Sequence, residues 1–337
     1  MIPKPTFSRQ QAPLWQHELR KAFARPADLL EFLQLDPTLP ALQLERLRDF
    51  PLRVPYGFAA RMKKGDASDP LFLQVWPQVR EAEATPGYAQ DAVGDLHKLK
   101  PGGLIHKYEG RALVVATGAC AVNCRYCFRR HFPYSDSIAA RNHWQETLQQ
   151  LASDPSIEEV ILSGGDPLSL SDDKLAELIT GLDALPQLRR LRIHTRQPVV
   201  LPERVDESLL SWIRSTRLQV AVVIHANHAN ELDEQVATAL KQFRDNGAIL
   251  LNQSVLLRGV NDTPDALESL SKRLFECGVL PYYLHLLDKV EGAAHFEVPL
   301  EEAVTLMQAL SARLSGYLVP RLVREDAGAP SKTLLPW

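Results

Sequence analysis

Short, mostly apolar runs alternate with longer amphipathic runs through the middle and C-terminal parts of the chain. The apolar runs are too short for helices and lack strict alternation, which predicts strands covered on both faces. The predicted strands are residues 112–117, 158–164, 188–195, 219–226, 248–257 and 280–287. Apolar residues recur with helical spacing in the other runs. The predicted helices are residues 140–154, 171–185, 206–215, 230–247, 263–278 and 300–316.

Residues at the ends of these runs support the helices. Ser171 is followed by Asp172 and Asp173, which is typical of a helix start. Gly247 and Gly278 follow two other helices, where a residue with positive φ commonly ends a helix. Six strand–helix units in series predict an α/β fold with a parallel sheet and right-handed crossovers. The chain is too short for an eight-unit barrel, which leaves a partial (β/α)6 barrel or an open doubly wound sheet.

The N-terminal part has a different pattern. Residues 1–105 combine helical spacing with interrupting prolines, which predicts a helical N-terminal extension. We expect the barrel to occupy residues 106–300, and a last helix with a tail to occupy residues 301–337.

Composition and charge narrow the class of protein. The chain has 337 residues, 45% of them hydrophobic and 23% charged, as in ordinary globular enzymes. A formal net charge of -3 gives no reason to expect a nucleic acid partner. The sequence contains no apolar run long enough for a membrane span, and its start is polar and proline-rich. We therefore expect a cytoplasmic protein, in which clustered cysteines are more typical of metal ligands or catalytic groups than of disulfides.

Polar residues follow all six predicted strands. In parallel α/β folds the chemistry collects at the carboxyl ends of the strands. The residues at these ends are the cysteine-rich segment 119–132, Ser163 to Asp166, His194 to Arg196, His225 to His228, Asn252 to Arg258 and His285 to Lys289.

The cysteine-rich segment follows the first predicted strand of the barrel. Cys120, Cys124 and Cys127 have the spacing C-x3-C-x2-C, and thiolates select zinc, copper(I) or iron–sulfur clusters. A fully ligated [4Fe–4S] cluster takes four cysteines, so three leave one iron open. Cys277 ends a predicted helix, where we expect it to lie at the opposite face of the barrel. Two alternatives are a closed zinc site with His131 as fourth ligand, and buried thiols without a metal.

This motif and its position resemble the radical S-adenosylmethionine superfamily. The resemblance implies a partial barrel in which the open iron binds S-adenosylmethionine, whose reductive cleavage gives a 5′-deoxyadenosyl radical. Gly164, Gly165 and Asp166, in "SGGD", match the glycine-rich segment that receives the methionyl amino group. A tight turn after a strand is the alternative for this segment. His225 and Gln253 are further candidates for cofactor contacts, although a packed histidine is nearly as common.

Between about Lys107 and Thr333 the chain also resembles the lysine 2,3-aminomutase family. The matching pieces include "CRYCFRRHF", "RQPVVLPERV", "NQSVLLRGVND", "PYYLHLLDKVEGAAHF" and "SKT". The resemblance implies pyridoxal 5′-phosphate as a further cofactor, attached to Lys332. It also implies migration of an amino group from C2 to C3 of L-lysine. A tail lysine would otherwise be a solvent-exposed residue, so we expect the tail to fold back into the mouth of the barrel.

The same resemblance implies roles for charged residues. Arg129 matches the arginine that pairs with the substrate carboxylate, while Asp288 and Glu325 match the acids that hold the distal ammonium. Asp326 takes the second acidic role if the match slips by one residue. Lys107 and Arg111 match positions near the cofactor phosphate.

The sequence departs from the family pattern at two places, and two rival functions remain. The family's glycine-rich approach to the lysine becomes "DAGAPS" here, and His285 stands where the family has a tyrosine near the cofactor. The shorter family members imply supply of β-lysine to the ligase that modifies elongation factor P, with flavodoxin or ferredoxin as reductant. The rival functions are an aminomutase acting on another amino acid such as glutamate, and a zinc or iron–sulfur binding protein without catalysis.

Overall fold

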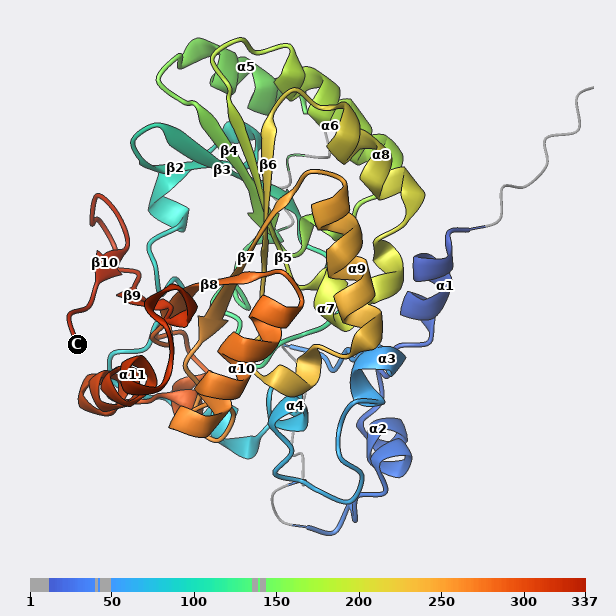
Figure 1. Ribbon diagram of the computed structural model, residues 1–337, viewed down its shortest axis with the longest axis vertical. Helices are drawn as coiled ribbons and strands as arrows, with labels where there is room; N and C mark the ends of the chain where they lie inside the picture. Colours follow the sequence, from blue (N-terminus) through green and yellow to red (C-terminus); the bar gives the residue numbers. More distant parts are fainter. Residues whose placement is uncertain (1–11, 40–41, 43–49, 135–138, 140–143) are drawn as a thin grey trace, which may run out of the picture.

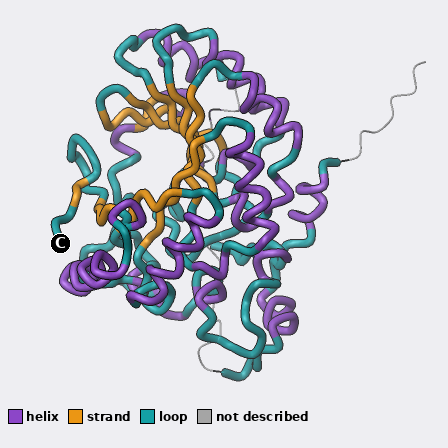
Figure 2. Tube along the Cα trace, in the orientation of Figure 1, coloured by secondary structure: helices purple, strands orange, loops and turns teal. Residues whose placement is uncertain are grey.

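A single curved sheet organises the chain (Figures 1 and 2). The computed structural model describes residues 12–39, 42, 50–134, 139 and 144–337. The sheet has ten strands, and their order in space is their order along the chain. Among the described residues the first and last strands do not pair, so the sheet is an open barrel. The strands are β1 Leu99–Lys100, β2 Leu104–Tyr108, β3 Arg111–Thr117, β4 Glu159–Gly164, β5 Arg190–Thr195, β6 Gln219–Ile224, β7 Ile249–Val255, β8 Leu280–His285, β9 Arg321–Arg324 and β10 Thr333–Leu334.

Helices cover the convex side of the sheet, and the strands curve around its other side (Figure 2). The helices are α1 Leu14–Arg20, α2 Pro26–Leu33, α3 Tyr56–Ala59, α4 Pro70–Leu73, α5 Gln145–Ser153, α6 Asp172–Asp183, α7 Gln197–Val200, α8 Glu207–Ser215, α9 Glu234–Asp245, α10 Pro264–Glu276 and α11 Leu300–Arg313. None of the helices in the described part of the chain is long and apolar enough to cross a lipid bilayer.

The six predicted strands are confirmed as β3 to β8, which are parallel neighbours. The helices predicted between them are confirmed as α5, α6, α8, α9 and α10, and α11 follows β8. The start of the first predicted helix, at residues 140–143, lies outside the described residues. Ser171 is the N-cap residue of α6, although its side chain makes no capping hydrogen bond. Gly247 and Gly278 have positive φ after α9 and α10, as expected.

The sheet is longer than the predicted six strands. β9 continues the parallel part beside β8, and β1, β2 and β10 add antiparallel edges. These strands are short, and the pattern of so few residues does not distinguish a strand from a loop. In β9, for example, two buried residues, Leu322 and Val323, lie between exposed arginines. The tail is therefore part of the sheet, as its predicted return to the barrel mouth requires.

The two faces of the strands have different surroundings. In β4, Val160 and Leu162 belong to the large apolar core under the helices, while Ile161 and Ser163 line the central cavity. In β5, Leu191 and Ile193 likewise face the core, and the intervening residues face the cavity. Each strand alternates because its side chains point to opposite faces in turn. The inner face thereby presents polar groups without interrupting the core.

A second core attaches the N-terminal extension to the barrel. It contains apolar residues of α1 to α4 together with Ala121 and Val122 from the cysteine-rich segment, and Val200 and Leu201 after β5. Cys124 packs against the same cluster. The extension therefore covers the loop that carries the cysteines, which brings residues far apart in sequence to the same end of the barrel.

Candidate active site

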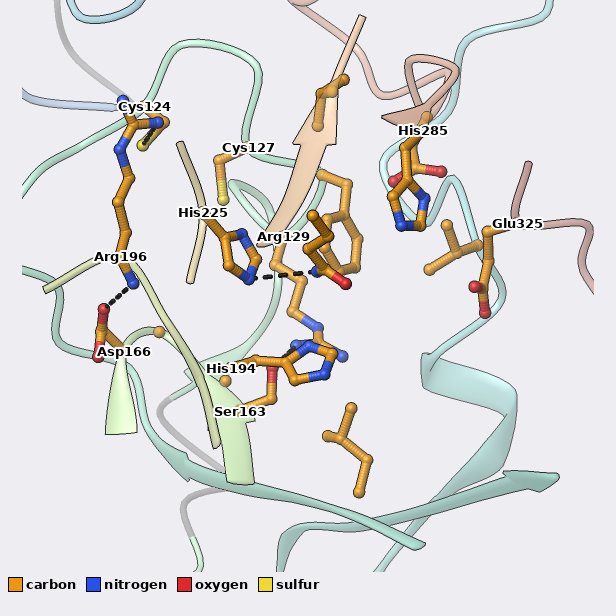
Figure 3. Close-up of a pocket in the computed structure, with 18 of the residues that line it drawn as sticks. Cys124, Cys127, Arg129, Ser163, Asp166, His194, Arg196, His225, His285 and Glu325 are labelled. Atoms are coloured by element: carbon orange, nitrogen blue, oxygen red, sulfur yellow. Dashed lines mark hydrogen bonds between the residues drawn. The ribbon is translucent and has the colours of Figure 1, made fainter. Parts of the chain in front are cut away.

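One large cavity occupies the carboxyl end of the parallel strands. Its volume is about 620 Å³, and its lining includes residues from the loops after β3 to β8 and from the tail. All the predicted site residues line it: Lys107, Arg111, Cys120, Cys124, Cys127, Arg129, Gly164, Gly165, Asp166, His225, Gln253, Asp288, Glu325 and Lys332. The side chains labelled in Figure 3 surround this space from several strands. The structure thus brings together residues separated by more than 200 positions in the sequence.

The three clustered cysteines are free thiols at one end of the cavity. Burial raises the pKa of Cys120 well above its usual value and that of Cys127 to about 11. Such thiols become thiolates when a metal binds them, and soft thiolates suit an iron–sulfur cluster. Cys277 is buried in the apolar core at the end of α10, away from this cavity. The donor set therefore fits a cluster with three protein ligands.

His131 does not complete a closed zinc site with these thiols. Its Nε2 lies 3.3 Å from the carbonyl oxygen of Glu291. This geometry disfavours the four-ligand alternative considered from the sequence.

Two arginines hold the cysteine-containing loop against the N-terminal extension. Arg125 donates from Nε to Glu81 Oε1 at 2.8 Å, and its backbone N–H donates to the carbonyl of Gln74 at 2.9 Å. Arg130 donates to Glu81 Oε2 at 2.7 Å. Burial alone would raise the pKa of the Glu81 carboxyl group. The guanidinium groups of Arg125 and Arg130 outweigh this effect and lower that pKa. The Glu81 carboxylate therefore fixes the chain on both sides of Cys127.

The glycine-rich segment after β4 packs directly on the backbone that precedes Cys120. Gly164 has φ +117°, and a Cβ atom there would lie 2.6 Å from the carbonyl oxygen of Thr117. At Gly165 a Cβ atom would lie 2.5 Å from the carbonyl oxygen of Ala119. Neither position has room for a side chain, because the two backbones are in contact. This contact sets the position of the cysteine loop relative to β4.

Asp166 connects the glycine-rich segment to the end of β5. Its carboxylate accepts hydrogen bonds from Thr195 Oγ1 at 2.7 Å and from the backbone N–H groups of Leu168, Arg196 and Gln197 at 2.8–3.1 Å. The acceptor sites of the Asp166 carboxylate are therefore already occupied by donors from the protein itself. Asp166 therefore orders the cavity wall, and its predicted contact with a cofactor stays a prediction.

Arg129 and Asp95 form a buried pair that lines the cavity. The Arg129 Nε and one terminal nitrogen both lie 2.8 Å from Asp95 Oδ2, and the other terminal nitrogen donates to Ser163 Oγ at 2.9 Å. Lys107 Nζ lies 2.6 Å from Asp95 Oδ1. Burial opposes the charge of Asp95, but Arg129 and Lys107 outweigh it and lower its pKa. Asp95 thereby orients Arg129, whose guanidinium suits a carboxylate.

Acidic groups and the tail lysine meet at another part of the cavity. Glu325 accepts a hydrogen bond from Tyr108 Oη at 2.5 Å and pairs with Lys332 Nζ at 2.7 Å. Asp288 is half-buried, and its enclosed Oδ1 has no hydrogen-bond partner among the described residues. Burial raises the pKa of Asp288 from 3.8 to about 7. An unpaired carboxylate in this position suits a cationic ligand, because an ammonium offsets the cost of its burial.

Glu325 and its neighbour Asp326 have different surroundings. Glu325 lines the cavity, whereas Asp326 pairs with Arg324 at 2.7 Å and accepts a hydrogen bond from Thr333 Oγ1 at 2.6 Å. Asp326 is not among the residues that line the cavity. The cavity lining therefore agrees with the sequence match that gives Glu325 the second acidic role. It does not agree with the alternative match, shifted by one residue, that gives this role to Asp326.

Three histidines form part of the cavity wall (Figure 3). His225 Nε2 lies 3.2 Å from Gln253 Nε2, and its ring centroid lies 5.9 Å from that of His194. Burial lowers the pKa of His225 to about 3 and the pKa values of His194 and His285 well below their usual range. All three imidazoles are therefore neutral near pH 7. The Nε2 atoms of His194 and His285 lack partners among the described residues, which leaves them available to a bound molecule.

Arg111 lies near the acidic groups at the edge of the cavity. Its guanidinium carbon is 4.7 Å from the centre of the Tyr108 ring, and the residue lines the cavity beside Lys107. In contrast to Lys107, its side chain has no ion pair among the described residues. A partly exposed, unpaired cation is the type of group that binds a phosphate.

Sequence reasoning missed several residues that build the site. Asp95 follows no strand, and nothing in "GDLHK" distinguishes it from a surface carboxylate. Tyr108 had no assigned role. Arg196 and Ser163 were recognised at strand ends, but their contacts with Cys124 and Arg129 depend on the folded chain.

Comparison with known proteins gives consistent matches. A profile described as the Radical SAM superfamily matches residues 114–270. An L-lysine 2,3-aminomutase from Escherichia coli (strain K12) is 47% identical over 95% of this chain and 94% of its own length. The Haemophilus influenzae protein with the same name is 46% identical over 99% of this chain and 98% of its own.

A longer relative matches a smaller part of its own length. The L-lysine 2,3-aminomutase from Clostridium subterminale is 29% identical over 95% of this chain and 77% of its own length. Together with the cavity and its three thiols, these similarities show that the chain belongs to the lysine 2,3-aminomutase family of the radical SAM superfamily, whose members use a [4Fe–4S] cluster and S-adenosylmethionine.

Proposed function

We propose that this protein is an isomerase that converts L-α-lysine to β-lysine by moving the amino group from C2 to C3. The observation that carries the proposal is the charge arrangement of the cavity. Three thiols, a buried arginine and two carboxylates line the cavity together with Lys332. Lys332 pairs with Glu325 and also interacts electrostatically with Asp288. Family membership supports the same reaction, since relatives that align over nearly their full length are named L-lysine 2,3-aminomutase.

Cys120, Cys124 and Cys127 would hold the [4Fe–4S] cluster. With S-adenosylmethionine, such a cluster supplies the one-electron chemistry that starts radical reactions in this superfamily. The protein contributes three thiols in a covered loop and no fourth cysteine, since Cys277 lies in the apolar core. The Glu81 contacts of Arg125 and Arg130 support this assignment, because they fix the loop before any ligand binds.

Lys332 would hold pyridoxal 5′-phosphate. This cofactor, when attached to a lysine amine, supplies a conjugated system through which an amino nitrogen migrates. Lys332 has a side chain only 24% exposed and lines the cavity beside Glu325. Arg111 would contact the phosphate, with Lys107 as a second cation that is already paired with Asp95. The neutral side chains of His225 and Gln253 suit the polar but uncharged parts of the cofactors.

The ends of the substrate would be recognised by charge. Arg129, oriented by Asp95 and Ser163, would pair with the α-carboxylate. Asp288 and Glu325 would hold the distal ammonium, and an ammonium would offset the burial of Asp288. Glutamate carries a carboxylate at its distal end, so the same two acids would repel it. The lining therefore favours lysine over glutamate.

The role of the product is a further part of the proposal. The chain is 47% identical to the Escherichia coli relative and 29% identical to the Clostridium subterminale one. The sequence resemblance to family members that supply β-lysine to the ligase that modifies elongation factor P supports the same role here. Flavodoxin or ferredoxin would provide electrons. A cytoplasmic location fits thiols that must stay reduced to bind iron.

The reaction is tested with anaerobically purified and reconstituted protein. L-lysine should give β-lysine only when S-adenosylmethionine, pyridoxal phosphate and a reductant are all present, and glutamate should give no β-amino acid. Chromatography of derivatised products with mass detection measures both. Turnover of glutamate without turnover of lysine would overturn the charge assignment. Complete activity after removal of pyridoxal phosphate would overturn the assignment of that cofactor.

The cysteine assignment predicts which thiols carry iron. Replacing Cys120, Cys124 or Cys127 by serine should reduce the bound iron from about four per chain to a small fraction and abolish activity. Cys277→Ser is the matched control, because this thiol lies in the apolar core. Iron and sulfide analysis with EPR of the reduced protein measures the outcome. Loss of the cluster in the control, or its retention in any of the other three, contradicts the assignment.

The Lys332 assignment predicts the site of covalent cofactor attachment. Borohydride reduction should leave a phosphopyridoxyl group on the peptide that contains Lys332, and Lys332→Arg should remove it. Lys289→Arg is the control, since Lys289 is 55% exposed and pairs with Glu297. Peptide mapping by mass spectrometry locates the group. A stoichiometric adduct elsewhere in the wild-type chain excludes Lys332 from this role.

The raised pKa of Asp288 predicts that the free energy of unfolding of the cofactor-free protein depends on pH. Between pH 3.8 and about 7 the folded chain keeps a proton on Asp288 that the unfolded chain releases. This residue therefore lowers the free energy of unfolding as the pH rises, by at most about 1.4 kcal/mol per pH unit. Above pH 7 its contribution is constant.

The variant Asp288→Asn is neutral at every pH, so it should gain stability relative to wild type between pH 5 and 7 and keep that gain at pH 8. Urea denaturation at these pH values measures the difference. Asp245→Asn, at the surface near Lys241, controls for the general pH dependence of unfolding. A difference between wild type and Asp288→Asn that does not change with pH contradicts the prediction.

A further inference from the structure

Arg196 connects the two segments on which the proposed radical chemistry depends. It follows β5, and its backbone N–H donates to Asp166 Oδ2 at 2.8 Å, beside the glycine-rich segment. Its side chain extends to the cysteine loop, where a terminal nitrogen lies 3.2 Å from Cys124 Sγ (Figure 3). Among the hydrogen bonds that side chains of the described residues donate, this is the one that reaches a cysteine sulfur. A single residue thus joins Asp166 to Cys124.

The guanidinium of Arg196 is held in one orientation. Its second terminal nitrogen donates to Gln74 Oε1 at 2.8 Å and to Glu231 Oε2 at 3.0 Å. The guanidinium carbon lies 5.5 Å from the ring centre of Phe58 and 5.6 Å from that of Tyr126. Arg196 is only 7% exposed, so few alternative orientations are open to it.

The carboxylate that holds Arg196 is itself fixed. Glu231 is fully buried, and its Oε1 accepts hydrogen bonds from Gln74 Nε2 at 3.1 Å and from the backbone N–H groups of Asn227 and His228 at 2.8 and 3.0 Å. These contacts leave Oε2 for Arg196. A guanidinium stays protonated in proteins, so the positive charge beside Cys124 is permanent. The contacts of Arg196 with Gln74 and Glu231 prearrange this charge.

We propose that Arg196 is a positioning residue that fixes the Cys124 thiolate and raises the reduction potential of the cluster bound to it. A one-electron reductant adds one negative charge to a [4Fe–4S] cluster, with no proton and no other group transferred. A buried cation that donates a hydrogen bond to a ligand sulfur stabilises the more negative state more strongly. The inference rests on the proposed cluster assignment, because Cys124 must be a ligand.

Arg196 differs from the other arginines near the cysteines in what its side chain contacts. Arg125 and Arg130 are also near the cysteines, but their charges are directed to Glu81. Arg129 is directed to Asp95 and Ser163. Arg196 is also paired with a carboxylate, yet it keeps one terminal nitrogen for sulfur. The sequence "CRYCFRR" therefore supplies arginines that fix the loop, while the arginine whose side chain contacts sulfur comes from the segment after β5.

The test is the midpoint potential of the reconstituted cluster in Arg196→Met, measured by EPR-monitored titration with dithionite. Removing the cation should shift the reduction equilibrium about tenfold toward the oxidised cluster, which is a fall of about 59 mV for one electron. Arg196→Lys keeps the charge on a shorter, single donor, so its potential should lie between those of Arg196→Met and wild type.

Two further variants separate this role from general packing. Arg61 lies over the same Phe58 ring at 5.4 Å and donates to the backbone carbonyl of Glu231, without contact to a cysteine. Arg61→Met therefore controls for loss of a nearby buried arginine and should shift the equilibrium less than Arg196→Met. Glu231→Gln removes the negative charge that faces Arg196, so it should raise the potential. If Arg196 had only a structural role, Arg196→Met and Glu231→Gln would not be expected to shift the midpoint potential in opposite directions.

Iron and sulfide analysis accompanies every titration and separates the possible failures. A wild-type protein that binds no four-iron cluster would overturn the cluster assignment together with this inference. A loaded wild type and a loaded Arg196→Met with equal potentials would overturn the inference alone. If Arg196→Met does not retain its iron, Arg196→Lys and Glu231→Gln decide: an unchanged potential in both overturns the inference, and opposite shifts support it.

Discussion

Buried charge is the constraint on which this site depends. A charged side chain that leaves water is costly unless a partner of opposite charge accompanies it. Arg125 and Arg130 lie beside Glu81, Arg129 lies beside Asp95, and Arg196 lies beside Glu231. Glu81 and Asp95 come from the N-terminal extension. The extension therefore also stabilises the barrel mouth. Its carboxylates Glu81 and Asp95 pair with arginines that would otherwise be buried without a partner.

The same constraint divides the cavity into regions with different chemistry. Around the thiols, the nearby cations are permanent arginines, each already directed by a carboxylate. At Asp288 the carboxylate is buried and incompletely paired, so its charge depends on what binds beside it. Neutral histidines line the wall. A molecule that carries a carboxylate at one end and an ammonium at the other therefore finds complementary groups, whereas a molecule with two carboxylates does not.

The parallel sheet explains how these regions come together. Because β3 to β8 are parallel neighbours, their carboxyl ends lie at the same end of the barrel. Alternation along each strand then sends one set of side chains to the apolar core and the other to the cavity. The backbone contact between the glycine-rich segment and residues 117–119 aligns β4 with the cysteine loop. Arg196 extends this alignment to β5, and the short strands β9 and β10 carry Glu325 and Lys332 back to the cavity.

The sequence by itself determined the series of six strands and their helices, because each has a hydrophobic period that local residues specify. It also determined the three-thiol motif and the polar strand ends, since both depend on residue type and spacing. Only the tertiary structure decided the partners of the buried charges. Asp95, Glu81 and Glu231 are ordinary acids in the sequence, and they are distinguished by enclosure with particular arginines after folding. Pairing across the fold, which no local pattern encodes, selected Glu325 over Asp326 for the cavity and directed Arg196 to Cys124.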